Sequence, residues 1–546
     1  MRSFHARSAL NGSEDRFTGN ATSLGPWFHA CAGGVLALHL KDLQLTYCSQ
    51  RTPIQESFLL AQAKPNIIIL VLDALRARNL GCYGMPGNPS PNIDAVAKRG
   101  VVFEDTYSSF NTTDQSLTSI MSGRYPRHNG MMNHGDKVSK EEWERLNRTD
   151  TRLTAEVLKE AGYDTIAVDW MGRWHKRGYD NYGYEIDRAA VGRLKYYSFD
   201  LPKQYIEYMV GHLPILELYA PQRKSEKGDL VKGLKDVWST FMFSRRLAQL
   251  QDAGFVTDVA RERIRNRSDN PFFLFLHYWD THTPYHCPNS YLKRYNPGKD
   301  HNSYLTAKYM GSISYTDYHV GRLFSTLHKE GLLNDTLVVI TSDHGDSLTE
   351  HGIYFDHHGL YKETTHCPMV LHYPNRFPQG KRIPGFVQHI DLLPTFCELL
   401  GIEMPESQFD GHSLLGSITG DRPVERDHVF IEESYVQKKA ALRTDTYTYI
   451  KATDGEGWCN YCQKVHVGTE ELYDLENDPG EENDVTSERP EVAAELRERL
   501  DHTIAELDAK REAELASTGD DGGEDVELSA EEEEILKKRL KDLGYM

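Results

Sequence analysis

The sequence predicts an α/β fold with a smaller unit of sheet and helix toward its C-terminal end. Four apolar runs have the length and composition of buried strands, at 67–72, 164–168, 272–277 and 337–341. Segments with helical spacing of apolar residues alternate with them, at 91–99, 114–122, 153–161 and 303–330. This alternation is typical of an α/β fold. Strand-like segments near 428–432 and 446–451, followed by a charged amphipathic helix over 491–515, predict the smaller unit.

Composition indicates a globular chain and limits its partners. The 546 residues are 39% hydrophobic and 10% aromatic, which is typical of a folded protein with a sizeable core. A formal net charge of −19 argues against a nucleic-acid partner, because phosphate backbones are bound by clustered Lys and Arg. We therefore expect a small or polymer-borne substrate in place of a nucleic acid.

Two of the strand-like runs end on residues that bind metal ions. Asp73 follows the run 67–72, and Asp343 and His344 follow the run 337–341. Ligands of open α/β sheets collect at the carboxyl ends of the strands, where two carboxylates and an imidazole would suit a divalent cation. Either aspartate alone is more often a cap of a helix or turn.

Thr113 lies at the expected start of the helix over 114–122, which Gly123 and Pro126 end. The free backbone N–H groups at a helix start favour anions. An ordinary Thr N-cap is the commoner use of threonine there, so the neighbouring motifs must decide between the two interpretations.

Several motifs occur in one order from Lys64 to about Val485, and together they resemble the alkaline phosphatase superfamily, most closely its sulfatase branch. They include Ser122-Gly123-Arg124-Tyr125-Pro126, Gly172-Arg173-Trp174-His175, Asp280-Thr281-His282-Thr283-Pro284, Ser342-Asp343-His344-Gly345 and His389-Ile390-Asp391-Leu392-Leu393-Pro394-Thr395. The resemblance implies an alkaline-phosphatase-like mixed sheet sandwiched by helices and a metal-dependent ester hydrolase.

The chain departs from sulfatases at the nucleophile. Their Cys-x-Pro-x-Arg signature, with Cys or Ser converted to formylglycine, aligns with Thr113, Gln115 and Leu117 here. Threonine cannot become formylglycine, so none is expected. A threonine at this position is typical of relatives that cleave phosphoesters, among them nucleotide pyrophosphatase/phosphodiesterases and phosphoethanolamine transferases. The chemistry therefore favours a phosphodiester or phosphonate ester, within a class of sulfate or phosphate esters borne by a small molecule, glycan or lipid.

The metal set also departs from the family. Ala74 stands where sulfatases place a second aspartate, and Asp343-His344 replaces their Asp-Asn pair. We hypothesise that Asp73, Thr113, Asp343 and His344 surround one divalent ion, Ca²⁺, Mn²⁺ or Zn²⁺. A two-metal site is the competing arrangement, and it would use Asp280, His282 and a distant histidine.

The resemblance assigns further roles around this centre. His282 would bind a substrate oxygen or protonate the leaving group. Arg173 and His175 match the Lys and His of the family's Gly-Lys-Trp-His motif, and a guanidinium suits a tetrahedral oxyanion. His357 stands at the position of a substrate-binding lysine, although the adjacent His358 is an equal candidate for the inward side chain.

We expect four parts of the chain. These are an extension of unknown role at 1–62, the sulfatase-like catalytic domain at 63–424, the small C-terminal subdomain at 425–515, and a linker with a charged terminal helix at 516–546. Residues 186–250 form either a cap over the site or a surface insertion.

No segment predicts a membrane anchor. The apolar stretch between Pro26 and Lys41 is shorter than the roughly 20 residues that span a bilayer, and its flanks do not suit a secretory signal. We therefore expect a cytoplasmic protein, which disfavours the membrane-anchored phosphoglycerol or phosphoethanolamine transferases. A noncatalytic binding protein on the same scaffold is the third hypothesis. Cys459 and Cys462, with His466, fit either a zinc site or a reduced pair.

Overall fold

The computed structural model describes residues 64–169, 171–183, 252–283, 285–298, 300–420, 422–434, 438–454 and 470–517. The predictions for the extension at 1–62, the insertion at 186–250, the Cys459/Cys462 pair and the terminal helix beyond residue 517 lie outside these residues.

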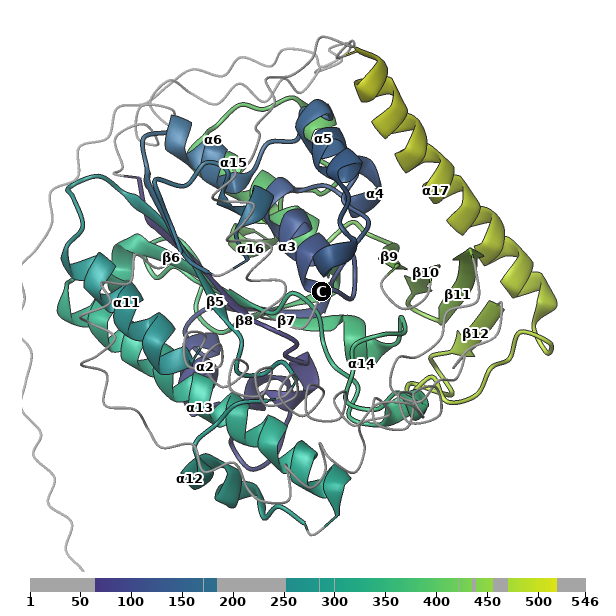
Figure 1. Ribbon diagram of the computed structural model, residues 1–546, viewed down its shortest axis with the longest axis horizontal. Coiled ribbons are helices and arrows are strands. Elements are labelled where there is room, and N and C mark those ends of the chain that lie inside the picture. The colour runs from purple at the N-terminus through teal and green to yellow at the C-terminus, as the bar shows by residue number, and fades with distance from the viewer. Residues whose placement is uncertain are drawn as a thin grey trace, which may run out of the picture. The chain divides into compact units, whose positions relative to one another are not determined.

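A large mixed sheet forms the centre of the described chain (Figure 1). Its strands are β1 (Asn66–Leu72), β2 (Val101–Tyr107), β3 (Asp164–Val168), β4 (Asn181–Tyr182), β5 (Phe272–Tyr278), β6 (Thr336–Thr341), β7 (His366–His372) and β8 (Lys381–Gln388). They follow the order β4-β3-β5-β1-β6-β7-β2-β8. β7 runs antiparallel to both of its neighbours, and the other neighbouring pairs are parallel. The predicted α/β fold with a mixed sheet is confirmed.

Helices cover both faces of this sheet (Figure 1). One face carries α2 (Pro91–Ala97), α11 (Ala253–Arg265), α12 (Asn289–Leu292) and α13 (His301–Lys329). The other carries α3 (Thr113–Ser122), α6 (Thr154–Glu160), α15 (Leu392–Leu400) and α16 (Leu415–Thr419). Short helices α4 (Pro126–Asn129), α5 (Lys140–Arg148) and α14 (Lys362–Thr365) lie in the connections.

The central strand explains why both faces must be covered. In β1 the even-numbered Ile68 and Leu70 pack into one hydrophobic cluster, whereas Ile67 and Ile69 pack into the other. Successive side chains of a strand point to opposite faces, so a continuous apolar run is buried on both sides. The centre of the sheet is thereby fixed, and with it the strand ends that carry the site.

The smaller unit consists of an antiparallel sheet and a long helix. The strands β9 (His428–Glu433), β10 (Lys438–Thr444), β11 (Tyr447–Asp454) and β12 (Glu470–Asp474) follow the order β12-β11-β10-β9. Helix α17 (Pro490–Ser517) lies across them and also contacts α4, as Figure 1 shows at its right-hand side. No helix in the described ranges has the length and apolarity needed to cross a membrane.

Candidate active site

Asp73 and Asp343 meet at the carboxyl ends of two adjacent parallel strands. β1 pairs with β6 so that Val71 lies opposite Thr341, and each aspartate follows its strand by one or two residues. The Ala74 N–H donates to Asp343 Oδ1 over 3.2 Å, and both aspartates are fully buried. Ala74 adopts a φ of +56°, a strained conformation for a residue with a Cβ, and this turn brings its N–H to the neighbouring carboxylate.

Thr113 is the first residue of α3, with Thr112 as the N-cap, so its side chain lies at the positive end of the helix. Its Oγ1 is 3.4 Å from Nε2 of His344, and the residue is almost completely buried. Gly123 ends the helix with a φ of +69°, as the sequence predicted. The side chains predicted to bind metal, Asp73, Thr113, Asp343 and His344, therefore lie together.

A backbone carbonyl fixes the orientation of His344. Its Nδ1 donates to the carbonyl of Gly345 over 2.7 Å, which leaves Nε2 as the acceptor nitrogen. That Nε2 lies 3.5 Å from Asp343 Oδ2 and 3.7 Å from Asp73 Oδ1. Burial lowers the pKa of His344 to about 4, so the ring is neutral at physiological pH. Gly345 is required in this loop, because a Cβ there would lie 2.1 Å from the carbonyl oxygen of Glu363.

The two carboxylates fit a divalent cation. Asp73 Oδ1 and Asp343 Oδ2 are buried and receive no hydrogen bond from any residue in the described ranges. Burial raises the pKa of Asp343, because an ionised carboxylate is poorly solvated there. Buried carboxylate oxygens without hydrogen bonds are costly unless a cation is bound between them, so this donor set matches the metal that the fold implies.

His277 and Asp169 extend this centre, and the sequence interpretation missed both. His277, in β5, places Nε2 3.1 Å from Asp73 Oδ2 and Nδ1 2.9 Å from Asp169 Oδ1. Burial alone would lower the pKa of His277, but the hydrogen bonds to Asp169 and Asp73 raise it to about 10. The available signals were a histidine within an otherwise apolar strand and an aspartate directly after the run 164–168.

His282 and His357 join His344 in a second group of ligand atoms. One nitrogen of each ring lies within 4.8 Å of the others. His282 is partly exposed and stacks on Trp279, with ring centroids 4.2 Å apart. His357 is the inward member of its pair, whereas His358 directs Nδ1 toward Asp356 Oδ2 at 3.2 Å.

His175 lies beside the helix that carries Thr113. It belongs to the short helix η4 (Arg173–Lys176), and its Nε2 is 3.1 Å from Asp114 Oδ1. The same carboxylate receives the N–H of Gly135 at 2.8 Å and lies 3.0 Å from Nδ1 of His134. His175 therefore orients Asp114, the residue that follows Thr113. The predicted side-chain contact of Arg173 lies outside the described side chains.

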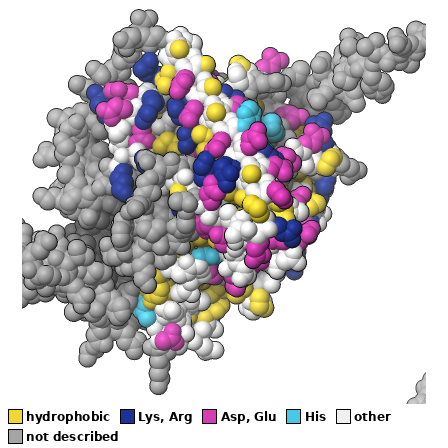
Figure 2. All heavy atoms as spheres, turned by 90° about the vertical axis from the view of Figure 1, so that its right-hand side faces the viewer, with side chains coloured by type: hydrophobic (Ala, Val, Ile, Leu, Met, Phe, Trp, Pro, Cys, Tyr) yellow, Lys and Arg dark blue, Asp and Glu magenta, His cyan; other side chains and the backbone are white. Residues whose placement is uncertain are grey.

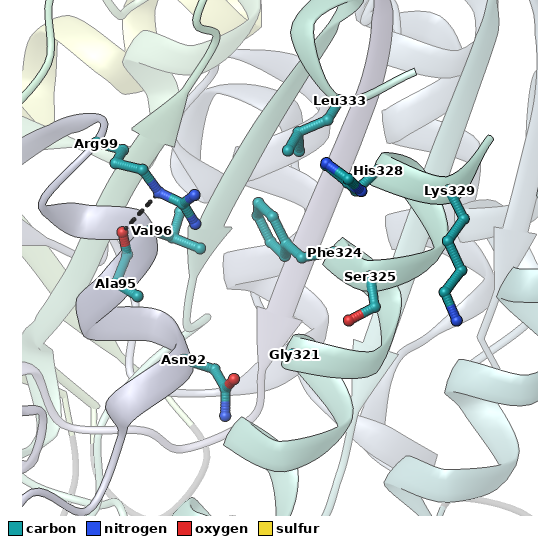
Figure 3. A pocket seen from close by; sticks show the side chains of 10 residues that line it. All are labelled: Asn92, Ala95, Val96, Arg99, Gly321, Phe324, Ser325, His328, Lys329 and Leu333. Atoms are coloured by element: carbon teal, nitrogen blue, oxygen red, sulfur yellow. Dashed lines mark hydrogen bonds between the residues drawn. The ribbon is translucent and has the colours of Figure 1, made fainter. Parts of the chain in front are cut away.

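A pocket elsewhere on the molecule contains none of the predicted site residues. It has a volume of about 310 Å³ and lies between α2 and α13, lined by Arg99, Phe324 and His328 among others (Figure 3). The chemistry described above therefore belongs to the strand ends and not to this pocket.

Comparison with known proteins identifies the family. The sequence model of the sulfatase family matches residues 65–402, more than half of the chain. The chain belongs to the sulfatase family. A second match, to the C-terminal part of N-sulphoglucosamine sulphohydrolase, covers residues 349–510 and includes the smaller sheet.

Relatives of this sulfatase-family chain are similar along most of their length. It is 25% identical to N-acetylgalactosamine-6-O-sulfatase of Bacteroides thetaiotaomicron over 517 residues, 84% of the chain and 96% of the relative. It is 27% identical to human arylsulfatase A over 483 residues, 82% of the chain and 88% of the relative. Family membership and these relatives identify the chain as an ester hydrolase.

Solved structures confirm the fold. A protein in complex with its substrate D-glucosamine-2-N,6-O-disulfate superposes with a TM-score of 0.59 and 18% identity, covering 82% of this chain and 98% of that one. The phosphonate monoester hydrolase of Agrobacterium radiobacter superposes with a TM-score of 0.57 and 18% identity, covering 82% of this chain and 96% of that one.

Proposed function

We propose that this chain is a metal-dependent hydrolase of sulfate or phosphate esters that uses Thr113 as its nucleophile. The chemistry favours a phosphodiester or a phosphonate monoester. The observation that carries the proposal is the position of Thr113 Oγ1, at the start of α3, 3.4 Å from His344 Nε2 and beside the carboxylates of Asp73 and Asp343. Threonine cannot be converted to formylglycine, so the hydroxyl of Thr113 itself must attack the ester.

The residues around Thr113 supply what a weak nucleophile lacks. A neutral hydroxyl attacks slowly until its proton is lost, and a divalent ion held by Asp73 and Asp343 would lower the pKa of a coordinated hydroxyl. The N–H groups of the first turn of α3 face the same space and would stabilise charge on the equatorial oxygens of the transferred group. Attack forms a bond from Oγ1 to phosphorus and releases one alcohol, and water then cleaves the threonine ester, whose phosphorus keeps the second substituent of the diester or phosphonate.

The ester class follows from the nucleophile. An aldehyde hydrate can expel sulfate from its own carbon once sulfuryl transfer is complete, whereas a threonine ester must be hydrolysed by a second attack. Phosphorus accepts such an in-line second displacement under metal-assisted catalysis. The relatives of this chain are named as sulfatases, and one neighbour with a similar fold is named as a phosphonate monoester hydrolase. Both names are consistent with hydrolysis of a sulfate or phosphorus ester.

Turnover of matched p-nitrophenyl esters tests the proposal. The substrates are the sulfate, the phosphate, the phenylphosphonate and the bis-phosphate, assayed with metal-reconstituted protein. We expect phosphonate or diester cleavage in the wild type and a loss of at least about 1,000-fold in kcat for Thr113→Ala, as for other covalent nucleophiles. Mass spectrometry of acid-quenched turnover should show the rest of the substrate on the peptide that contains Thr113, a phenylphosphonyl group from the phosphonate or a p-nitrophenyl phosphoryl group from the bis-phosphate.

Thr112→Ala is the matched control. The Thr112 hydroxyl donates to Gln115 Oε1 over 2.6 Å, so its loss should leave kcat within a few-fold of wild type. Unchanged turnover in Thr113→Ala would refute a threonine nucleophile. Dominant sulfate cleavage that depends on Thr113 would retain the nucleophile and overturn the assignment of the ester class.

A further inference from the structure

Asp252, Asp280 and His286 form a separate group of metal-binding side chains, which we call the α11 cluster. Asp252 is the N-cap of α11, whereas Asp280 and His286 belong to the loop between β5 and α12. One ligand atom from each residue lies within 4.8 Å of the others. The sequence suggested Asp280 and His282 as partners in a two-metal site, but the structure groups Asp280 with Asp252 and His286 instead.

The α11 cluster is built on the face of the sheet that α11 and α13 cover. Ala253, which follows Asp252, and Tyr315 of α13 both pack into the hydrophobic cluster on that face. Thr113 begins α3, whose Leu117 packs into the cluster on the opposite face. The α11 cluster also shares no residue with the carboxylates at the ends of β1 and β6, so a cation bound there is distinct from the ion proposed beside the nucleophile.

The spacing of the ligand atoms in the α11 cluster suits a small divalent ion. His286 Nδ1 lies 3.0 Å from Asp280 Oδ1 and 3.6 Å from Asp252 Oδ2. Ligand atoms around a tetrahedral ion with bonds of about 2.0–2.2 Å are roughly 3.3–3.6 Å apart. Only small side-chain movements would therefore be needed to bring all three atoms into contact with one ion.

The carboxylates of the α11 cluster lack a cation among their ligand partners. Asp280 is buried, and within the described part of the chain its Oδ2 receives no hydrogen bond. Burial raises the pKa of Asp280 to about 8, and burial together with the charge of Asp280 raises the pKa of Asp252 to about 6. Burial lowers the pKa of His286 to about 4, although the charge of Asp252 opposes this and that of Lys308 adds to it. The ring is thus neutral, and either a proton or a metal ion must compensate the carboxylates.

Neighbouring donors orient Asp252 and leave its second oxygen available to an ion. Asp252 Oδ1 accepts the N–H groups of Gly254 at 2.8 Å and Phe255 at 3.2 Å, and the Tyr315 hydroxyl donates to Oδ2 at 2.9 Å. A carboxylate oxygen has two lone pairs, so Oδ2 retains one for a metal. The side chains of Asp252 and His286 are 19% and 16% exposed, which gives a hydrated ion access to the cluster.

We propose that Asp252, Asp280 and His286 bind a Zn²⁺-like divalent ion that joins the start of α11 to the loop after β5. One imidazole and two carboxylates favour such an ion over Ca²⁺, which takes about six to eight oxygen ligands. Water completes the coordination. The role of this ion is structural: the loop that it fixes also contains His282. The inference does not rest on the proposed function, because none of its ligands takes part in ester cleavage.

Metal-dependent hydrogen exchange of the full-length protein tests the inference without substrate. Chelator-treated protein is compared with protein titrated with Zn²⁺ or Co²⁺, and native mass spectrometry counts the bound ions. We expect the metal to protect the backbone amides of residues 252–258 in the wild type. His286→Gln should bind one ion fewer and lose this protection, with affinity reduced by more than the roughly 10- to 100-fold that loss of an outer partner costs. Asp343→Asn should keep the protection of residues 252–258, which separates this ion from the one at the ends of β1 and β6.

Asp252→Ser is a second ligand variant, in case His286→Gln does not fold. Serine retains the N-cap of α11 but removes the ligand carboxylate, so a role in capping alone would leave the ion count unchanged. His319→Gln is the matched control, because His319 is a buried imidazole that packs on Tyr315 with ring centroids 4.6 Å apart and lies outside the ligand group.

Loss of one ion and of the protection in the folded ligand variants, with both retained in His319→Gln, would support the inference. Exchange of residues 252–258 that does not respond to metal in the wild type would overturn it, and so would a full ion count in either folded ligand variant. Loss of the ion in His319→Gln as well would mean a general loosening of α11 and would also overturn it. In each of these cases a proton and not a metal ion compensates the cluster, and Thr113-dependent turnover is judged separately.

Discussion

At the scale of single residues, the unpartnered carboxylate oxygens of Asp73 and Asp343 dominate the energetics of the site. His277 reaches Asp73 Oδ2 but leaves Asp73 Oδ1 and Asp343 Oδ2 buried without hydrogen bonds, so a metal ion bound between these two oxygens should add to the free energy of unfolding. A ligand at about 100 times its Kd adds about 2.7 kcal/mol to the free energy of unfolding. The strand ends therefore couple folding to metal occupancy.

Asp343→Asn should break this coupling. The substitution removes one buried charge, so the chelator-treated variant should unfold at the same temperature as wild type or higher. The rise in Tm that Mn²⁺ produces in wild type should be mostly lost, because an amide is a weak ligand for such an ion. Differential scanning calorimetry with chelator and with Mn²⁺ measures both effects. Asp346→Asn, in the same loop but hydrogen-bonded to Tyr285, should keep the Mn²⁺-induced shift.

The sequence predicted that Asp73, Asp343 and Thr113 belong to one site because each follows a simple local pattern. An aspartate after an apolar run and a threonine before a helical run are visible without knowledge of the fold. His277 was missed because its role depends on register: it lies opposite Val71, and only that pairing brings it beside Asp73. The choice between His357 and His358 likewise depended on the path of a loop, which residue type does not reveal.

At the scale of elements, edge strands were the hardest to predict. The central strands β1, β5 and β6 are continuous apolar runs, and the sequence located all three within a residue or two. Strand β8, at the edge of the sheet, has the sequence Lys-Arg-Ile-Pro-Gly-Phe-Val-Gln and lacks a regular alternation of apolar residues. An edge strand pairs with a neighbouring strand along one backbone edge only, so it tolerates charged residues, proline and glycine. The antiparallel insertion of β7 between β6 and β2 is a property of tertiary contacts that no local pattern encodes.

Glu363 connects α14 to the loop that follows β1, and it predicts an acid-dependent loss of stability. Burial would raise the pKa of Glu363, but His351 and Arg76 lower it to about 2. The unfolded value is about 4.3, so the ionised form adds stability above that pH, and the contribution is lost as pH falls from about 4.3 toward 2. Glu363→Gln should cost up to about 3 kcal/mol at pH 7.

Urea unfolding of Glu363→Gln and wild type at pH 7, 5 and 4 measures this dependence. The difference in unfolding free energy should be constant between pH 7 and 5 and smaller at pH 4, where the unfolded wild type begins to bind a proton. A difference that stays the same at all three values would show that the loss comes from packing and not from the charge.

Helix α17 is held to the main domain by a buried guanidinium. Arg124 is almost fully buried and donates to Glu514 on α17 at 2.8 and 3.1 Å, and to the carbonyl of Thr149 at 2.7 Å. Glu514→Gln removes the counter-charge of a cation that water reaches poorly, which costs about 1–3 kcal/mol. Hydrogen exchange should accelerate in the last turns of α17 and in α4. Glu512 is exposed on the same helix, so the amide exchange rates of the Glu512→Gln variant should match those of wild type. Equal amide protection in the Glu514→Gln and Glu512→Gln variants would contradict the role of Arg124.

At the scale of the whole molecule, the formal charge of −19 opposes the approach of an anionic ester. Figure 2 shows acidic and basic side chains interspersed on the face that carries α17, so no single basic region of that face offsets the field.

Raising the ionic strength from about 0.01 to 0.15 M shortens the screening length from about 30 to 8 Å. The kcat/KM of p-nitrophenyl esters should therefore rise with salt, about twice as steeply in logarithm for a dianionic monoester as for a monoanionic diester or sulfate. A neutral acetate ester is the control and should show no trend. A fall in kcat/KM with salt would mean that bound cations and the helix terminus at Thr113 control the approach, so that the local charge of the site outweighs the charge of the chain.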